Sequence, residues 1–572
     1  MAETLVSPGV LARENDQSFI TQNPVNVGAA LIGPTVKGRV NVPTLITSYS
    51  DFTNRFGAVL TSGSNEYTFF TSISAYNYFI NGGESLLVTR VVSGSYTAAT
   101  SSFVSGSTAG SLDSGSAFVL ETLSEGAIMN STGSEDISGS LTNGTSDNVR
   151  WEIQNSSTAS GTFTLLVRQG NDNTNDKTIL ETWTGLSLDP KASNFISRII
   201  GDQDLNYNST DNQVDVSGSY PNASRYIRVK SIDSDFLTPD YFDNNGNPKA
   251  AYTGFIPANQ SGSFGNAVGE IKAGANFYEN INNSNTQGLV ADNYTNMINL
   301  MSNQDDYRFN ILLAPGIYNS DYTTACTSMI TNTQNRGDSL LVLDLVPYAS
   351  SITTTTTQAA ARNTSYAASY WPWVQVLDPD TGAQVWVPAS TVMGGVFAYN
   401  DSVSEPWFAP AGINRGGLSQ VIRAEKKLSQ ANRDTLYQGK VNPIATFPGT
   451  GVVVYGQKTL QQRASALDRV NVRRLLIQLK SYISQVAQNL VFEQNTIATR
   501  NAFLSQVNPY LESVQQRQGL YAFKVVMDDS NNTPDVIDRN QMVGQIYIQP
   551  TKTAEFIYLD FNILPTGATF PA

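Results

Sequence analysis

The clearest pattern of apolar and polar positions lies between residues 439 and 564. Strand-like stretches such as GVVVYG and GLYAFKVVM flank two segments whose apolar residues have helical spacing. A final stretch, AEFIYLDFNIL, places apolar side chains on one face of a strand, at Ile557, Leu559, Phe561 and Ile563. Such a face requires a core, and the pattern is the same whether that core belongs to this subunit or to a neighbour.

Two helices are predicted inside this region. The first has an apolar stripe typical of packing beneath a sheet, formed by Leu476, Leu479, Ile483, Val486 and Leu490. Its basic side chains predict a solvated face or salt bridges between subunits: Arg469, Arg473, Arg474 and Lys480. The second helix, over about residues 496–516, contains Pro509, which predicts a kink or a restart. We expect Arg500, Glu512 and Arg517 at its exposed positions.

The rest of the chain has two different characters. Residues 24–92 and 285–400 alternate apolar strands such as SLLVTRVV and LLVLDLVP with helical segments, which indicates βαβ units and a partly parallel sheet. Between them, a region rich in Ser, Thr, Gly and Asn carries short β-prone pieces separated by turns, which predicts an inserted, surface-exposed β-sandwich or barrel. Residues 1–21 are expected to form an extended arm. The predicted fold class is therefore multidomain, α/β and α+β, with a β-rich insertion.

Composition excludes several classes of protein. A chain of 572 residues is too long for one hydrophobic core, so several domains are expected. The formal net charge of −13 argues against direct binding to a nucleic-acid backbone. The N-terminus has no signal-peptide pattern and no apolar run approaches the roughly 20 residues that span a bilayer, so we expect a soluble protein without membrane insertion.

The sequence contains few residues that could form an enzyme active site. It has no histidine, which removes Ser-His and Cys-His pairs, and no GxxxxGK[ST] phosphate loop. The lone Cys326 has the setting of a buried thiol, and the loop at Asp202 lacks the residue order of a calcium site. Asp378 and Asp380 are the visible carboxylate pair, but Asp-Pro-Asp-Thr-Gly is better explained as a turn. No catalytic residue, cofactor or metal ligand is predicted. A carboxylate-dependent hydrolase and a self-assembling surface-layer protein remain less favoured alternatives.

Longer stretches resemble a known family. The segments EPWFAPAGINRGGL, FPGTGVVVYGQKTL, VNVRRL, QGLYAFKVVMDDSNNTP and GQIYIQPTKTAEFIYLDF follow one another as in the contractile tail sheath proteins of bacteriophages and of related contractile injection machines. SPGV near the N-terminus fits the same family. The resemblance is strong over residues 393–563, weak over the first 90 or so, and of no help over 93–250.

The resemblance implies a structural role in a virion and no enzymatic activity. The subunit would stack in hexameric rings around a rigid tube and contract from a metastable extended state, without consuming nucleotide, to drive the tube through the host envelope for genome delivery. Its implied partners are neighbouring sheath subunits, the tail tube protein, and baseplate and tail terminator proteins, with assembly in the host cytoplasm. A sheath of a phage-derived contractile injection system is the alternative within this class.

The resemblance also implies where subunits join. Terminal β-strands would be exchanged between neighbours, through Leu5, Val6, Val10, Leu11, Ile557, Leu559, Phe561 and Ile563. Arg500, Glu512 and Arg517 are the candidates for facing the tube. The expected organisation is an arm (1–22), an α/β domain in two parts (23–92 and 251–400), the inserted outer domain (93–250), an inner α+β assembly domain (401–564) and a tail (565–572).

Overall fold

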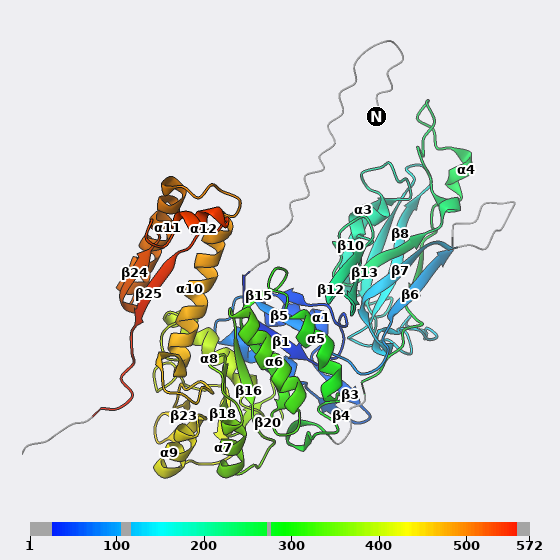
Figure 1. Ribbon diagram of the computed structural model, residues 1–572. Helices are drawn as coiled ribbons and strands as arrows, with labels where there is room; N and C mark the ends of the chain where they lie inside the picture. Colours follow the sequence, from blue (N-terminus) through cyan, green and yellow to red (C-terminus); the bar gives the residue numbers. More distant parts are fainter. Residues whose placement is uncertain (1–25, 105–115, 272–275, 558–572) are drawn as a thin grey trace, which may run out of the picture.

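The computed structural model describes residues 26–104, 116–271 and 276–557, which form a central α/β region, a β-rich insertion and a C-terminal helical unit (Figure 1). The insertion and the helical unit lie on opposite sides of the α/β region in this view. A mixed α/β architecture, as predicted, is thus observed. Within the described residues, no helix is long and apolar enough to span a bilayer.

The centre of the molecule is a six-stranded sheet in the order β17-β16-β15-β1-β5-β2. All of its pairings are parallel except that of β2 with β5. Its strands are β1 (Asn26–Gly33), β2 (Thr44–Ile46), β5 (Leu86–Arg90), β15 (Arg308–Tyr318), β16 (Leu340–Asp344) and β17 (Ala367–Ala368). β5 and β16 are buried along their whole length, as expected for strands covered on both faces.

Helices pack closely on this sheet. α2 (Phe70–Ile80) contacts α8 (Ser390–Val403), and both contact β15. Gly395 permits their approach, because a Cβ at this position would lie 2.6 Å from the carbonyl oxygen of Asn77. α5 (Thr295–Leu300) packs on α6 (Thr323–Arg336), which ends at Gly337 with φ of 70°, a left-handed conformation that favours glycine.

Two larger sheets form the core of the insertion. One has the order β13-β7-β6 and the other β10-β9-β8-β14. Their strands are β6 (Ala98–Val104), β7 (Ser116–Glu125), β8 (Val149–Ser157), β9 (Thr162–Gln169), β10 (Ile179–Ser187), β13 (Ile227–Ile232) and β14 (Gln260–Ser263). Side chains from both sheets share one core, in which Phe118 stacks on Phe163. β14 lies past the predicted end of the insertion at residue 250. Its sequence, QSGS, is polar, and the segment is a strand only through its pairing with β8.

Shorter elements complete the structure. In the first half they are α1 (Tyr49–Phe56), β3 (Leu60–Ser62), β4 (Asn65–Tyr67), α3 (Ile196–Ile200), β11 (Asp204–Asn208), β12 (Gln213–Ser217) and α4 (Ala250–Thr253). In the second half they are α7 (Ile352–Ala360), β18 (Tyr370–Trp371), β19 (Val374–Leu377), β20 (Gln384–Val387), β21 (Val421–Ala424), α9 (Gln430–Gln438), β22 (Asn442–Phe447) and β23 (Gly451–Val454).

The junction between the α/β region and the insertion is rich in buried charge. The fully buried Arg90 donates hydrogen bonds to the carbonyl oxygens of Gly38 and Glu125, at 2.7 and 2.8 Å, and its guanidinium lies over the ring of Tyr96. Ion pairs cross the same junction between Lys37 and Asp147 and between Arg39 and Asp204. Electrostatic contacts therefore hold the insertion on the α/β region, in addition to the chain segments that connect the two.

This junction predicts a dependence of stability on pH. Burial raises the pKa of Glu125 to about 7, against the opposing effect of Arg90 and Arg39. A raised carboxyl pKa means that the folded state binds the proton more tightly, so stability should fall as pH rises from 4.5 to about 7. Glu125→Gln should remove this loss, worth about 1–3 kcal/mol, and raise the melting temperature at pH 8 but not at pH 4.5. Calorimetry across this range measures the effect. Glu66→Gln, at an exposed site, should keep the wild-type dependence of melting temperature on pH. The same dependence in Glu125→Gln would contradict the prediction.

Candidate assembly surface

The C-terminal unit is built on two long helices, α10 (Val470–Gln488) and α11 (Ile497–Gln516), which lie side by side (Figure 1). Their contact includes Tyr482 stacked on Tyr510, with 3.8 Å between ring centroids. The apolar stripe of α10 begins one residue earlier than predicted: Leu475 and Leu479 are in the core of this unit, whereas Leu476 is not. Because Leu475 and Leu476 are adjacent, residue spacing alone does not distinguish which of the two lies on the buried face of the helix. α11 runs through Pro509 as one helix instead of restarting there.

A two-stranded antiparallel sheet, which we call the assembly sheet, covers α11. It consists of β24 (Leu520–Val526) and β25 (Gln545–Pro550), joined through a loop that contains α12 (Pro534–Asp538). Side chains alternate along both strands. Phe523, Val525, Ile546 and Ile548 pack toward the helices, whereas Tyr521 and Tyr547 are 62% and 56% exposed on the other face.

Both outer edges of the assembly sheet lack a strand partner within the described residues. A sheet of two strands is only marginally stable by itself, and its unpaired backbone N–H and C=O groups are a template for further strands. Leu520 is buried, but the other four inward side chains, Phe523, Val525, Ile546 and Ile548, are only partly buried. The unit therefore has the geometry of a sheet that can accept a strand at each edge.

The basic residues of α10 differ from their predicted setting. Arg473 and Arg474 are buried, not solvated. Arg474 forms a bidentate pair with Asp401 of α8, at 2.8 and 2.5 Å, and lies over the ring of Phe397. Arg473 lies over the ring of Tyr366 and donates to the hydroxyl of Ser365. These side chains join α10 to the α/β region of the same subunit; Lys480 is exposed, as predicted.

The three tube-facing candidates do not form one patch. Arg500 is only 4% exposed and pairs with Asp529 at 2.9 Å, so its prediction as an exposed residue is wrong. Glu512 is exposed, about 18 Å farther along the same helix. Arg517 is half exposed, pairs with Glu405 at 2.7 Å and lies over the ring of Trp407.

The residues predicted for strand exchange lie mostly outside the described ranges: Leu5, Val6, Val10, Leu11, Leu559, Phe561 and Ile563. Ile557, the last described residue, belongs to no strand and is 77% exposed. The predicted last strand is therefore absent from its described part, residues 554–557. Within residues 554–557, this apolar segment has no strand partner.

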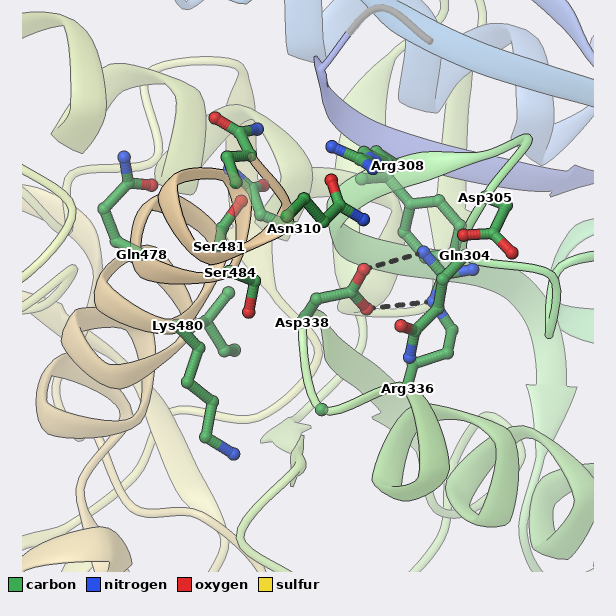
Figure 2. Close-up of a pocket in the computed structure, with 15 residues that line it drawn as sticks. Gln304, Asp305, Arg308, Asn310, Arg336, Asp338, Gln478, Lys480, Ser481 and Ser484 are labelled. Carbon is green, nitrogen blue, oxygen red and sulfur yellow. Dashed lines mark hydrogen bonds and ion pairs between the residues drawn. The ribbon is translucent and has the colours of Figure 1, made fainter. Parts of the chain in front are cut away.

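A polar groove lies between α10 and the α/β region (Figure 2). It has a volume of about 370 Å³ and is lined on one side by Gln478, Lys480 and Ser484 of α10. On the other side, Arg336 is saturated by Asp338 and by backbone carbonyl oxygens, so it offers no free cation to a ligand. Arg308, at the groove, pairs in register with Asn26, where the described part of the chain begins. Sequence reasoning did not anticipate this groove.

The residues that were considered for catalysis have structural roles instead. Asp378 is fully buried and accepts hydrogen bonds from the amide of Asp380 and the hydroxyl of Thr381 in its own turn. Asp380 accepts one from Tyr49 at 2.6 Å. Burial raises the pKa of Cys326 to about 12, which leaves its thiol protonated and unreactive. Within the described residues, no cluster of His, Cys, Asp and Glu could hold a metal ion.

Two family models match consecutive parts of the chain. Residues 287–460 match the phage tail sheath protein central domain, and residues 462–564 match the phage tail sheath C-terminal domain. Nearly half of the chain is thus similar to the phage tail sheath family. The second model includes both helices and the assembly sheet, so these elements are family features.

Curated tail sheath proteins are similar over part of their length. That of Vibrio phage KVP40 is 41% identical over 240 residues, which cover 41% of this chain and 36% of the relative. That of Enterobacteria phage T4 is 42% identical over 185 residues, covering 32% and 28%. The matched region is thus about a third of the length of these sheath proteins.

Solved sheath structures share the fold across almost the whole chain. A sheath tail protein from Listeria innocua has a TM-score of 0.52 and 9% identity, covering 92% of this chain and 96% of its own. The helical sheath of the anti-feeding prophage in its contracted state has a TM-score of 0.50 and 16% identity, covering 98% and 99%. The β-rich insertion therefore occurs on a sheath fold, although the family models do not reach it.

Proposed function

We propose that this chain is the structural subunit of a contractile phage tail sheath and that it has no enzymatic activity. Its subunits stack in hexameric rings around the tail tube in a metastable extended state. Contraction drives the tube through the host envelope and so delivers the genome. The observation that carries this proposal is the assembly sheet, which has two partnerless edges within the described residues and lies in the family's C-terminal domain.

Strand exchange is the proposed link between subunits. A segment from the N-terminal arm of one neighbour and a segment from the C-terminus of another add to the two edges of the assembly sheet, with backbone hydrogen bonds between strands. The apolar residues of these segments are Leu5, Val6, Val10, Leu11, Ile557, Leu559, Phe561 and Ile563. The exposure of Ile557 supports this link, because burial of an exposed apolar side chain against a neighbouring subunit lowers the free energy.

Other surfaces follow from this arrangement. The insertion faces outward, where its added bulk does not disturb the rings. Glu512 and Arg517, at the exposed end of α11, contact the tail tube, whereas the buried Arg500 does not. The ends of the sheath meet baseplate and tail terminator proteins, and subunits assemble in the host cytoplasm before they become part of the virion.

Electron microscopy of the purified full chain tests this function. We expect helical tubes, including a short and wide contracted form. A surface-layer protein would instead give flat two-dimensional arrays, and that result, or a protein that stays monomeric at high concentration, would contradict the proposal.

A further inference from the structure

A cluster of hydrogen bonds around Glu555 holds the C-terminal segment that follows β25. Both oxygens of Glu555 accept hydrogen bonds from Arg469, at 2.7 and 2.9 Å, and one also accepts a hydrogen bond from the hydroxyl of Tyr437 at 2.8 Å. The side-chain amide of Gln457 donates to Glu555 and to the hydroxyl oxygen of Thr553, at 3.1 and 2.5 Å. We call this group the Glu555 anchor.

The partners of the anchor come from separate elements. Tyr437 is in α9 and Gln457 follows β23, both in the central-domain match, whereas Arg469 is the N-cap residue immediately before α10. Glu555 therefore ties the end of the C-terminal domain back to the central domain. Burial by itself would raise the pKa of Glu555, but the hydrogen bonds from Arg469 and Tyr437 outweigh it and hold the pKa below its usual value, so the carboxylate is charged at neutral pH.

Beyond the anchor the chain turns outward. Phe556 and Ile557 are 68% and 77% exposed, although both are large and apolar. They lie at a groove of about 770 Å³ whose wall includes the exposed side chains of Ile413 and Tyr455. The segment is thus fixed at Glu555 and solvent-exposed directly afterwards.

The anchor is also connected to the core. Arg469 is the N-cap residue of α10, and the first turns of that helix carry Arg473 and Arg474, whose buried contacts reach Tyr366 and Asp401. A force applied to the C-terminal segment would pass through Glu555 and Arg469 into α10 and from there into the α/β region.

We propose that the Glu555 anchor fixes the point at which the C-terminal segment leaves the subunit and thereby lets its link to a second copy of the chain bear load. The inference rests on the proposed strand exchange. Without the anchor, the exchanged strand would be attached through a longer loose tether, which lowers the effective concentration of the strand at the neighbour's sheet.

The test compares Glu555→Gln with Glu493→Gln, which changes an exposed glutamate in the loop after α10. Two quantities are measured on the full chain: the rate of tryptic cleavage after the exposed Lys552 in the unpolymerised protein, and the critical concentration for polymerisation. We expect both to rise about tenfold in Glu555→Gln, with an unchanged melting temperature. Tyr437→Phe, which removes one hydrogen bond, should give a smaller rise, and Glu493→Gln none.

The outcomes separate this inference from the proposed function. An unchanged cleavage rate shows that the anchor does not hold the segment, and faster cleavage with an unchanged critical concentration shows that the link does not depend on it; either result overturns the inference while the sheath function stands. A wild-type chain that never polymerises overturns the proposed function and the inference with it. Should Glu555→Gln fail to fold, the milder Tyr437→Phe decides between the same outcomes.

Discussion

Deletion of residues 1–18 is expected to leave a folded subunit that no longer forms tubes. The deleted residues precede the described core, which begins at Asn26. An added strand gains about 0.5–1.5 kcal/mol per hydrogen bond but costs about 1–2 kcal/mol per ordered residue, so its hydrogen bonds alone do not hold it. In the proposed link, burial of Leu5, Val6, Val10 and Leu11, at about 1.5–3 kcal/mol each, would offset this cost, and the deletion removes all four.

The matched control removes residues 565–572, which follow the C-terminal family match and the apolar segment. This variant should polymerise like the full chain, whereas the N-terminal deletion should stay monomeric by analytical ultracentrifugation and show no tubes by negative-stain microscopy. Long ordered tubes from the N-terminal deletion would refute the role of the arm.

Arg474→Ala is expected to lower the free energy of unfolding by about 2–4 kcal/mol. The change removes a bidentate, buried guanidinium, leaves Asp401 without its partner and opens a cavity beside Phe397. The change also removes a contact between α10 and α8. Urea denaturation measures the lower free energy of unfolding, and the loss should appear in the transition in which the C-terminal unit separates from the α/β region.

An exposed ion pair supplies the comparison. Arg539 pairs with Asp535 within one turn at the surface, where such pairs contribute little, so Arg539→Ala should cost about 0.5 kcal/mol or less. If the two variants were equally stable, the buried pair could not be the connection between α10 and the core that load transfer from Glu555 requires.

Periodicity in the sequence predicted the elements whose burial is local in origin. The apolar runs at Leu86–Arg90 and Leu340–Asp344 are fully buried strands of the central sheet. These features depend on side-chain pattern and backbone conformation within a few residues, which spacing records directly.

The setting of charged residues could not be predicted in the same way. Arg474 has the spacing of a solvated helix position, and only the approach of Asp401, 73 residues earlier, makes it a buried pair. Arg500 is similarly covered by the segment around Asp529. The Glu555 anchor depends on residues from three separate segments. Such contacts are set by tertiary packing, and nothing in the local sequence distinguishes them from surface charges.

In the assembled sheath, each assembly sheet is expected to be completed by segments of neighbouring copies. Helical reconstruction of the tubes by electron cryo-microscopy tests it directly, at a resolution that separates strands about 4.8 Å apart. The expected density contains one additional strand at each edge of β24–β25, traceable to residues before Asn26 of one copy and after Ile557 of another. Bare edges in the assembled tube, or added strands that trace to the same subunit, would contradict the account.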